Sequence, residues 1–363
     1  MRPIDLIPGV SLLVVCGTGF VGALFTQAMH TSPDLPVWNG EWGVTWEKSL
    51  DQQVFVREPS VVAWAIVEYG LFKNGRPGVI VGDDDWLFTS EEFTLYPHDT
   101  NNLQRNLRTA LAAADEIRQR GAKLVVVLVP AKARVEADHL GRYTVPDQVA
   151  ARPGPFVAGL RAAAIDVFDV EPALREARVS NQVFLRTDTH WTPHGADAAA
   201  KAIASHVRAA GAGWVDSATV TRTQGPATPH SGDLLRYIPL GPFQRTMGPP
   251  ADTIVTPIVA VDAGGGLLGD ATIPATLVGT SYSDDTRWGF LGALQVAFSS
   301  DVLNAAAQGK GPFVSMAAYL DDRAWTTNPP QLVIWEIPER YLGVEYDLDE
   351  YGFWAEYGQQ IRM

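Results

Sequence analysis

The chain has 363 residues, of which 46% are hydrophobic and 19% charged, a balance typical of a globular protein with a substantial core. Its formal net charge of −13 and the absence of any run of Lys and Arg argue against nucleic acid as a partner. An acidic polysaccharide would need a local basic groove to overcome the same repulsion. Cys16 is the single cysteine, so an intrachain disulfide is impossible and Cys-based metal or thiol chemistry in a folded domain is not expected.

The first segment of the chain is apolar. No charged residue occurs from Leu6 to Met29, and these 24 residues exceed the ~20 that a helix needs to cross a bilayer. Residues 1–30 are expected to form an uncleaved membrane anchor, because the run is long for a signal peptide and no small-x-small cleavage site follows it. A cleaved signal peptide is the alternative, and both place the rest of the chain outside the cytoplasm. A lipoprotein based on Cys16 is disfavoured because Val15 stands where a small residue is expected.

A linker and one large domain are expected to follow. Residues 31–60 are expected to form a linker and the entry to the domain, and the aromatic and acidic stretch 38–47 within them is expected to be extended. Residues 61–363 then form the domain. Within it, residues 211–273 are rich in Gly, Pro, Thr and Asp and lack strong periodicity, which predicts an insertion of loops and short strands.

Strands and helices alternate along this domain. Lys123–Val129 is a run rich in β-branched residues and ended by a proline, which is typical of a fully buried parallel strand. The alternation predicts a doubly wound parallel α/β sheet. In chain order, the predicted elements are a helix or buried strand at 61–71, a strand–turn–strand at 79–88, a helix at 99–119, a strand at 123–129, a helix at 159–164, strands at 165–168 and 183–185, a helix at 193–210, a strand at 275–278, a helix at 288–299 and a strand at 332–337.

The segment 186–195 carries the first candidate catalytic residues. Thr192 is suited to cap a helix and Pro193 to begin it, which places Asp188 and His190 in a loop between a strand and a helix. Such loops are where α/β folds place catalytic groups. An Asp two residues from a His can hold one imidazole nitrogen and leave the other free as a base. A structural His in an exposed acidic loop explains this segment equally well.

The second candidate follows the predicted strand at 275–278. That strand ends in Gly-Thr-Ser, so Ser281 is expected to emerge at its carboxyl end. Gly279 permits a tight turn and close approach of a substrate carbonyl, and the backbone N–H of Ser281 can help to form an oxyanion hole. Ser283 is the rival nucleophile, but it lies further from the strand end. An ordinary turn explains this motif alone, whereas its pairing with an Asp-x-His at another strand end indicates a Ser-His-Asp triad.

The motifs at 188–192 and 278–283 resemble those of the AlgJ/AlgX-type alginate O-acetyltransferases, a family with an SGNH-hydrolase-like fold. Residues 82–88 are similar to the family's Gly-x-x-Gly-Trp-Leu-Phe element, and residues 130–132 to its Pro-x-Lys. Asp85 departs from the family by standing where a Gly is usual. The predicted elements end near residue 337, so the C-terminal carbohydrate-binding module of AlgX-type members is not expected. Ordinary SGNH enzymes have their Ser block first, so the reversed order here implies a circularly permuted domain.

The resemblance implies roles and surroundings for the candidate residues. Ser281 would be the nucleophile, His190 the base and Asp188 the orienting acid, with an acetyl-serine intermediate and no cofactor. The acceptor would be an exopolysaccharide such as alginate. Acetyl groups would come from a multispanning membrane acyltransferase within a polysaccharide secretion complex. The protein would then sit in the inner membrane by one N-terminal anchor, with its catalytic domain in the periplasm.

Other functions remain open from the residues alone. A carbohydrate acetylesterase would use the same triad with water as acceptor, and a non-catalytic polysaccharide-binding scaffold would not need Ser281. A neutral glucan is an alternative acceptor, since a net charge of −13 fits a polyuronate poorly. Trp191, Tyr282 and Arg287 flank the motifs and are predicted to contact the substrate. Core packing for the aromatics and an ordinary ion pair for the arginine are the alternatives.

No metal site is predicted. His190 and His194 have a zinc-like spacing, but no Glu follows the first His and Pro193 separates the two. The acidic run at 83–85 lacks the spaced ligands and closing Glu of a calcium loop. The glycines at 264–266 are not followed by the Lys-Ser/Thr of a phosphate-binding loop.

Overall fold

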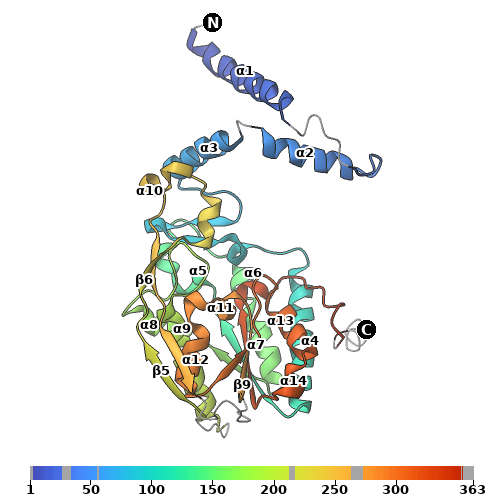
Figure 1. Cartoon of the computed structure of the whole chain (residues 1–363), viewed down its shortest axis with the longest axis vertical. Coiled ribbons are helices and arrows are strands. Elements are labelled where there is room, and N and C mark those ends of the chain that lie inside the picture. The colour runs from blue at the N-terminus through green and yellow to red at the C-terminus, as the bar shows by residue number, and fades with distance from the viewer. Residues whose placement is uncertain are drawn as a thin grey trace. The chain divides into compact units, whose positions relative to one another are not determined.

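The computed structural model describes residues 3–26, 34–54, 57–211, 217–262, 273–352 and 354. The chain divides into two compact units (Figure 1). The first unit consists of Met1–Arg76 and Arg236–Gly248. The second consists of Pro77–Leu235 and Pro249–Met363, and it contains all three predicted triad residues.

The first unit is helical in its described part. Its α-helices are α1 (Pro3–Leu24), α2 (Glu41–Gln53), α3 (Arg57–Phe72) and the short α10 (Gln244–Met247). The prediction of an extended linker over residues 38–47 is wrong where α2 forms. Asn39 Oδ1 accepts a hydrogen bond from the backbone N–H of Glu41 near the start of this helix, and Trp42 stacks on Trp46 one turn later at 5.8 Å.

Within the parts of the chain that the structure describes, no helix combines the length and the apolarity that a membrane crossing requires. The anchor predicted for residues 1–30 is therefore not shown.

A five-stranded parallel sheet forms the centre of the second unit. Its strand order is β10-β9-β11-β3-β4, and every neighbouring pair is parallel. The central strands are buried on both faces, as the apolar sequences of β3 and β11 predict. The strands are β3 (Lys123–Val129), β4 (Asp166–Asp169), β9 (Ala275–Val278), β10 (Val302–Asn304) and β11 (Leu332–Pro338).

Helices cover both faces of this sheet (Figure 1). Val125 and Val127 of β3 pack with α9 and α12 in one hydrophobic cluster, whereas Val126 and Leu128 pack with α4, α7 and α13 in the other. This is the three-layer arrangement predicted from the alternation of strands and helices. The helices of this unit are α4 (Asp99–Gln119), α5 (Lys132–Val135), α6 (Asp147–Ala150), α7 (Pro153–Ala162), α8 (Glu171–Arg178), α9 (Pro193–Ala209), α11 (Ser281–Asp284), α12 (Phe290–Phe298), α13 (Pro312–Asp321) and α14 (Ala324–Thr327).

The described part of this unit also contains three two-stranded antiparallel sheets. The first confirms the strand–turn–strand predicted at 79–88, and its turn places Asp85 at φ 61°, the left-handed region that favours glycine. The other two sheets are the short strands predicted within 211–273. The pairs are β1 (Val79–Val81) with β2 (Leu87–Thr89), β5 (Thr219–Thr223) with β8 (Ile258–Asp262), and β6 (Ala227–His230) with β7 (Asp252–Val255).

Some predicted elements differ from the structure. The predicted strand at 183–185 is wrong, because only an isolated bridge between Phe184 and Trp191 forms there. The helix predicted from residue 288 begins at Phe290, since Gly289 takes a positive φ of 65° and ends a short 3₁₀ turn. The ambiguous segment 61–71 is part of the helix α3.

Candidate active site

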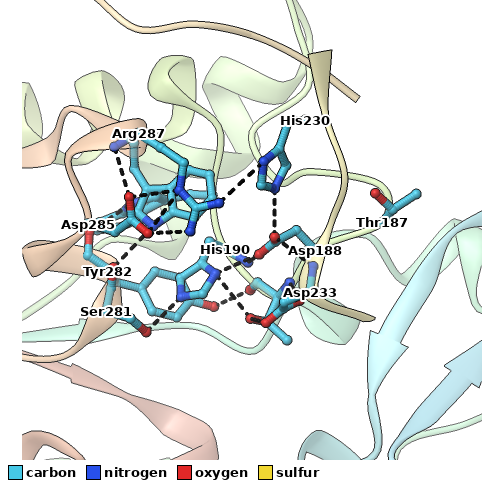
Figure 2. A network of polar contacts seen from close by, with 12 residues as sticks. Thr187, Asp188, His190, His230, Asp233, Ser281, Tyr282, Asp285 and Arg287 are labelled. Atoms are coloured by element: carbon cyan, nitrogen blue, oxygen red, sulfur yellow. Dashed lines mark hydrogen bonds and ion pairs between the residues drawn. The ribbon is translucent and has the colours of Figure 1, made fainter. Parts of the chain in front are cut away.

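His190 lies between Asp188 and Ser281 (Figure 2). Its Nδ1 is 2.6 Å from Asp188 Oδ1, and its Nε2 is 2.7 Å from Ser281 Oγ. An ionised carboxylate only accepts hydrogen bonds, so Nδ1 carries the proton and the lone pair of Nε2 faces the serine hydroxyl. The structure thus brings the three predicted residues together in the geometry of a nucleophile, a base and an orienting acid.

Ser281 is positioned by the end of strand β9 and the start of α11. Thr280 caps this short helix by accepting a hydrogen bond from the backbone N–H of Tyr282. In the described part of the chain, the backbone N–H of Ser281 has no hydrogen-bond partner, as an oxyanion-hole donor requires. Ser281 itself is half-buried, so its hydroxyl remains within reach of a substrate.

The buried carboxyl of Glu336, near the end of β11, fixes the turn that carries Ser281 by accepting hydrogen bonds from the residues on either side of it. It accepts hydrogen bonds from the backbone N–H of Thr280 at 2.7 Å and from the Ser283 hydroxyl at 3.0 Å. Burial raises the pKa of Glu336 to about 7, although these hydrogen bonds oppose the rise. Ser283, the rival nucleophile, is buried and committed to this carboxyl.

Gly279 has a packing role beyond the one predicted. A Cβ at this position would lie 2.4 Å from Glu336 Oε2 and 2.9 Å from Ser283 Oγ. The glycine therefore admits the Glu336 carboxyl beneath the turn, in addition to any role in substrate approach.

Asp188 is ionised despite its burial. Burial opposes ionisation, but hydrogen bonds from His190 and His230 outweigh it and hold the pKa of Asp188 well below its usual range. Oδ2 of Asp188 accepts from His230 Nε2 at 2.8 Å and from the backbone N–H of Asp233 at 3.0 Å. An ionised acid in this place stabilises the imidazolium that forms when His190 accepts a proton.

Lys132 holds the loop that carries Asp188. Its Nζ donates hydrogen bonds to the carbonyl oxygens of Leu87, Arg186 and Asp188 at 2.5, 3.1 and 2.9 Å. Burial lowers the pKa of Lys132 to about 8, although nearby acids, first among them Glu92, raise it. The Pro-x-Lys resemblance marked this residue, but its role was not predictable, because the carbonyls come from segments 45 to 56 residues away.

The segment predicted as a loop-rich insertion supplies further residues to this loop. Asp233 accepts from the backbone N–H and hydroxyl of Thr189, and Asp252 does the same for Thr187. Gly232 makes the approach possible, because a Cβ there would lie 2.0 Å from the carbonyl oxygen of Thr187. No periodic pattern in the sequence marked these residues or His230.

The three residues that were predicted to contact the substrate make other interactions in the structure. Trp191 and Tyr282 are almost completely buried, and the Tyr282 hydroxyl donates to the Thr189 carbonyl. Their side chains therefore pack beneath the site, which corrects the prediction that they contact the substrate. Arg287 is exposed but pairs with Asp285, which is the ordinary ion pair weighed as its alternative.

Trp288 contacts two of the triad residues. Its ring stacks on His190 at 4.8 Å, and its Nε1 donates to the Ser281 carbonyl at 3.1 Å. The aromatic plane restricts the imidazole to the orientation that faces Ser281.

Among the residues that the structure describes, two groups of side chains have the proximity that a metal ion needs. Asp188, His190 and Asp233 form one group, but their ligand atoms already take part in the hydrogen bonds described above. The other group is Glu136, Asp138 and His139, in which both acids pair with Arg178. Neither group has the open tetrahedral set of a catalytic zinc site.

A serine, a base and an ionised acid at the carboxyl edge of a parallel sheet suit acyl transfer through a covalent intermediate. The family model for the SGNH hydrolase-like domain of the acetyltransferase AlgX matches residues 79–339. The chain belongs to this AlgX family. The resemblance drawn from the motifs is confirmed, and the second unit has the SGNH-hydrolase-like fold.

Relatives within the AlgX family match nearly the whole chain. The probable alginate O-acetylase AlgJ of Pseudomonas putida is 37% identical, over 94% of this chain and 90% of the relative. That of Pseudomonas aeruginosa is 38% identical, over 88% of this chain and 84% of the relative.

Solved structures of related proteins are similar to the fold of this chain. The O-acetyltransferase domain of P. putida AlgJ superposes with a TM-score of 0.71 at 36% identity, covering 79% of this chain and 99% of that domain. P. aeruginosa AlgX superposes with a TM-score of 0.55 at 24% identity, covering 76% of this chain and 65% of AlgX, and supports the fold alone.

Proposed function

We propose that this protein is an O-acetyltransferase that moves acetyl groups onto hydroxyls of an exopolysaccharide through an acetyl-Ser281 intermediate. The observation that carries the proposal is the position of His190, 2.6 Å from the Asp188 carboxylate and 2.7 Å from the Ser281 hydroxyl. Membership of the AlgX family favours acetyl transfer among the reactions open to such a triad. The names of the AlgJ relatives favour alginate as the acceptor.

The first half-reaction forms the acetyl-enzyme. His190 Nε2 removes the Ser281 proton while Oγ attacks the acetyl carbonyl of the donor, and the Asp188 carboxylate stabilises the resulting imidazolium. The negative oxygen of the tetrahedral intermediate accepts a hydrogen bond from the backbone N–H of Ser281. The intermediate collapses when the bond to the donor's leaving group breaks and His190 returns its proton to that group.

The second half-reaction transfers the acetyl group. A sugar hydroxyl loses its proton to His190 as it attacks the acetyl-Ser281 carbonyl, and the Ser281–acetyl bond then breaks. His190 returns the proton to Ser281 Oγ, which restores the free enzyme. Water in place of the sugar would make the same residues an esterase.

An acceptor assay tests the transfer. The protein is incubated with an acetyl ester donor, with and without oligouronate acceptor, and acetylated oligosaccharide and free acetate are measured. Acetylated product that depends on acceptor and disappears in Ser281→Ala is expected. Release of free acetate at a rate unaffected by acceptor, with no acetylated sugar, would instead support the acetylesterase.

The domain is proposed to lie in the periplasm, held by an N-terminal inner-membrane anchor. The support is the charge-free run from Leu6 to Met29. Alkaline phosphatase fused to the carboxyl terminus is active only outside the cytoplasm, so an inactive fusion that is expressed would contradict this location.

The partners are proposed from the family resemblance. A multispanning membrane acyltransferase would supply acetyl groups across the membrane, and a polysaccharide secretion complex would deliver the acceptor. Co-purification of such an acyltransferase with the full chain from detergent-solubilised membranes is expected.

The order of the motifs, with Asp188 and His190 before Ser281, is further interpreted as a circular permutation of the SGNH arrangement.

A further inference from the structure

The Asp188 carboxylate is shared between two buried histidines (Figure 2). Oδ1 accepts hydrogen bonds from the Nδ1 and backbone N–H of His190, and Oδ2 accepts from His230 Nε2 and the backbone N–H of Asp233. A triad uses only one of these imidazoles. His230 is 6% exposed, so its hydrogen bond to Asp188 is shielded from water.

Asp188 and Arg287 together define the tautomer of His230. The ionised Asp188 carboxylate only accepts hydrogen bonds, so His230 Nε2, 2.8 Å from Oδ2, carries the proton. The Arg287 guanidinium can only donate, and its Nη1 lies 3.5 Å from His230 Nδ1, which favours a lone pair on Nδ1. Asp285 keeps Arg287 in place by accepting from its Nε at 2.9 Å and its Nη2 at 2.5 Å.

His230 is held against the loop that carries Asp188 and His190, called the catalytic loop below. It ends strand β6 opposite Asp252, whose carboxylate binds Thr187 in that loop. The Trp288 ring makes a T-shaped contact with the His230 ring at 5.4 Å and stacks on His190 at 4.8 Å. The two histidines therefore share a carboxylate and an aromatic side chain.

We propose that His230, in the Nε2–H tautomer set by Asp188 and favoured by Arg287, is a positioning residue for acetyl transfer at Ser281. This inference rests on the proposed function. A carboxylate can rotate about its last side-chain bond, and a donor on Oδ2 fixes the rotation at which Oδ1 faces His190. A donor on Oδ2 also withdraws negative charge from Oδ1, so it weakens the stabilisation of the His190 imidazolium. His230 thus aligns His190 with Ser281 but reduces the strength of His190 as a base.

A measurement of how His230 affects the pH dependence of activity must take into account the charged and titratable groups around it. Those that face it or its partners are Asp188, His190, Asp233, Asp252, Asp285, Arg287 and Lys132. A variant that removes His230 leaves all the others in place. The kcat/KM profile then reports the effect of one donor on the triad.

Two substitutions separate the donor from the ring. His230→Gln can place an amide N–H near the position of Nε2, whereas His230→Leu fills similar space without a donor. We expect the Leu variant to lose about 10- to 100-fold in kcat with little change in KM, because a misaligned base costs this much. Its acidic limb of kcat/KM should also move to higher pH. The Gln variant should recover most of the loss.

His206→Leu is the matched control. His206 pairs with Asp166 at 2.7 Å, but Asp166 begins strand β4 and so lies at the opposite edge of the sheet from Ser281. The variant removes a comparable Asp–His pair and is expected to leave kcat and the pH profile unchanged.

Histidine ¹⁵N spectra of the full chain provide a readout that does not need activity. They should show His230 with a proton on Nε2 and a lone pair on Nδ1. A doubly protonated His230, a Leu variant with unchanged kcat and pH profile, or a Gln variant as impaired as Leu would each overturn the inference. Failure of the proposed function is a distinct outcome, since it would appear as undiminished transfer by Ser281→Ala while the histidine spectra stay as expected.

Discussion

At the scale of single residues, Lys132 supports the site without touching substrate. Its ammonium group supplies hydrogen bonds to three carbonyl oxygens, one of them on Asp188. Lys132→Met would leave those buried acceptors without a donor, so we expect a loss of about 3 kcal/mol in the free energy of unfolding. Activity should fall as well, because the Asp188 loop loses its support.

Urea denaturation of both proteins measures this loss. Lys123→Met is the matched control, since Lys123 begins β3, the strand that precedes Lys132, but is exposed. Equal stability of the Lys132 and Lys123 variants would contradict the supporting role.

Glu336 makes stability depend on pH. Its folded pKa of about 7 lies above the ordinary value of 4.5, so between these values the folded state holds a proton that the unfolded state has released. The free energy of unfolding therefore falls as pH rises through this window, by about 3 kcal/mol for a shift of this size. Glu336→Gln should lack this contribution.

Denaturation at pH 5 and pH 8 tests the sign. The wild type should lose more stability than Glu336→Gln over this interval, whereas Glu176→Gln, at an exposed position on α8, should behave as the wild type. A pH dependence that is identical in all three proteins would show that the Glu336 proton is not linked to folding.

At the scale of elements, the turn between β9 and α11 depends on close packing over Gly279. Gly279→Ala would force its Cβ against Glu336 and Ser283, at a cost of about 1–3 kcal/mol in stability. We expect kcat to fall more than KM rises, because the turn displaces the Ser281 hydroxyl from His190.

A double-mutant cycle with Glu336→Ala identifies the clash. The glycine substitution should cost less in that background, because its closest contact, Glu336 Oε2, is removed, while Cβ of residue 336 and Ser283 Oγ remain at 2.9 Å. Gly154→Ala is the control, since nothing lies within 4 Å of a Cβ there. Additive effects of the two substitutions would contradict packing as the cause.

The elements that could be predicted are those whose sequence pattern lies within the element itself. Lys123–Val129 is apolar throughout and forms β3, and the Thr192-Pro193 signal marks the start of α9. The triad was predictable because each of its motifs follows or precedes such an element. The strand predicted at 183–185 failed, since its apolar side chains enter the core from a segment that makes only one bridge.

The rest of the site could not be predicted because it depends on distant contacts. His230 and Lys132 reach Asp188 from 42 and 56 residues away, and no pattern in their own segments indicates that approach. The segment around His230 looked like loops and short strands, and its contribution appears only when β6 and β7 bring it against the catalytic loop.

At the scale of the whole molecule, the net charge of −13 bears on the acceptor. Long-range repulsion raises the KM for a polyuronate at low salt, and screening weakens it because the Debye length falls from about 30 Å at 0.01 M to about 8 Å at 0.15 M. The KM for oligouronates should therefore fall as salt rises across this range, while that for a neutral oligosaccharide stays constant. A KM that rises with salt would indicate a local basic groove that dominates the encounter.

The central claim is that Ser281 carries the acetyl group, with His190 as its base. Mass spectrometry of the protein quenched in acid after mixing with an acetyl ester donor tests it most directly. The account predicts an added acetyl group on the peptide that contains Ser281, absent in Ser281→Ala, slow to form in His190→Ala, and discharged by oligosaccharide acceptor. Acetylated oligosaccharide formed at the normal rate by Ser281→Ala, with no acetylated peptide in the wild type, would contradict it.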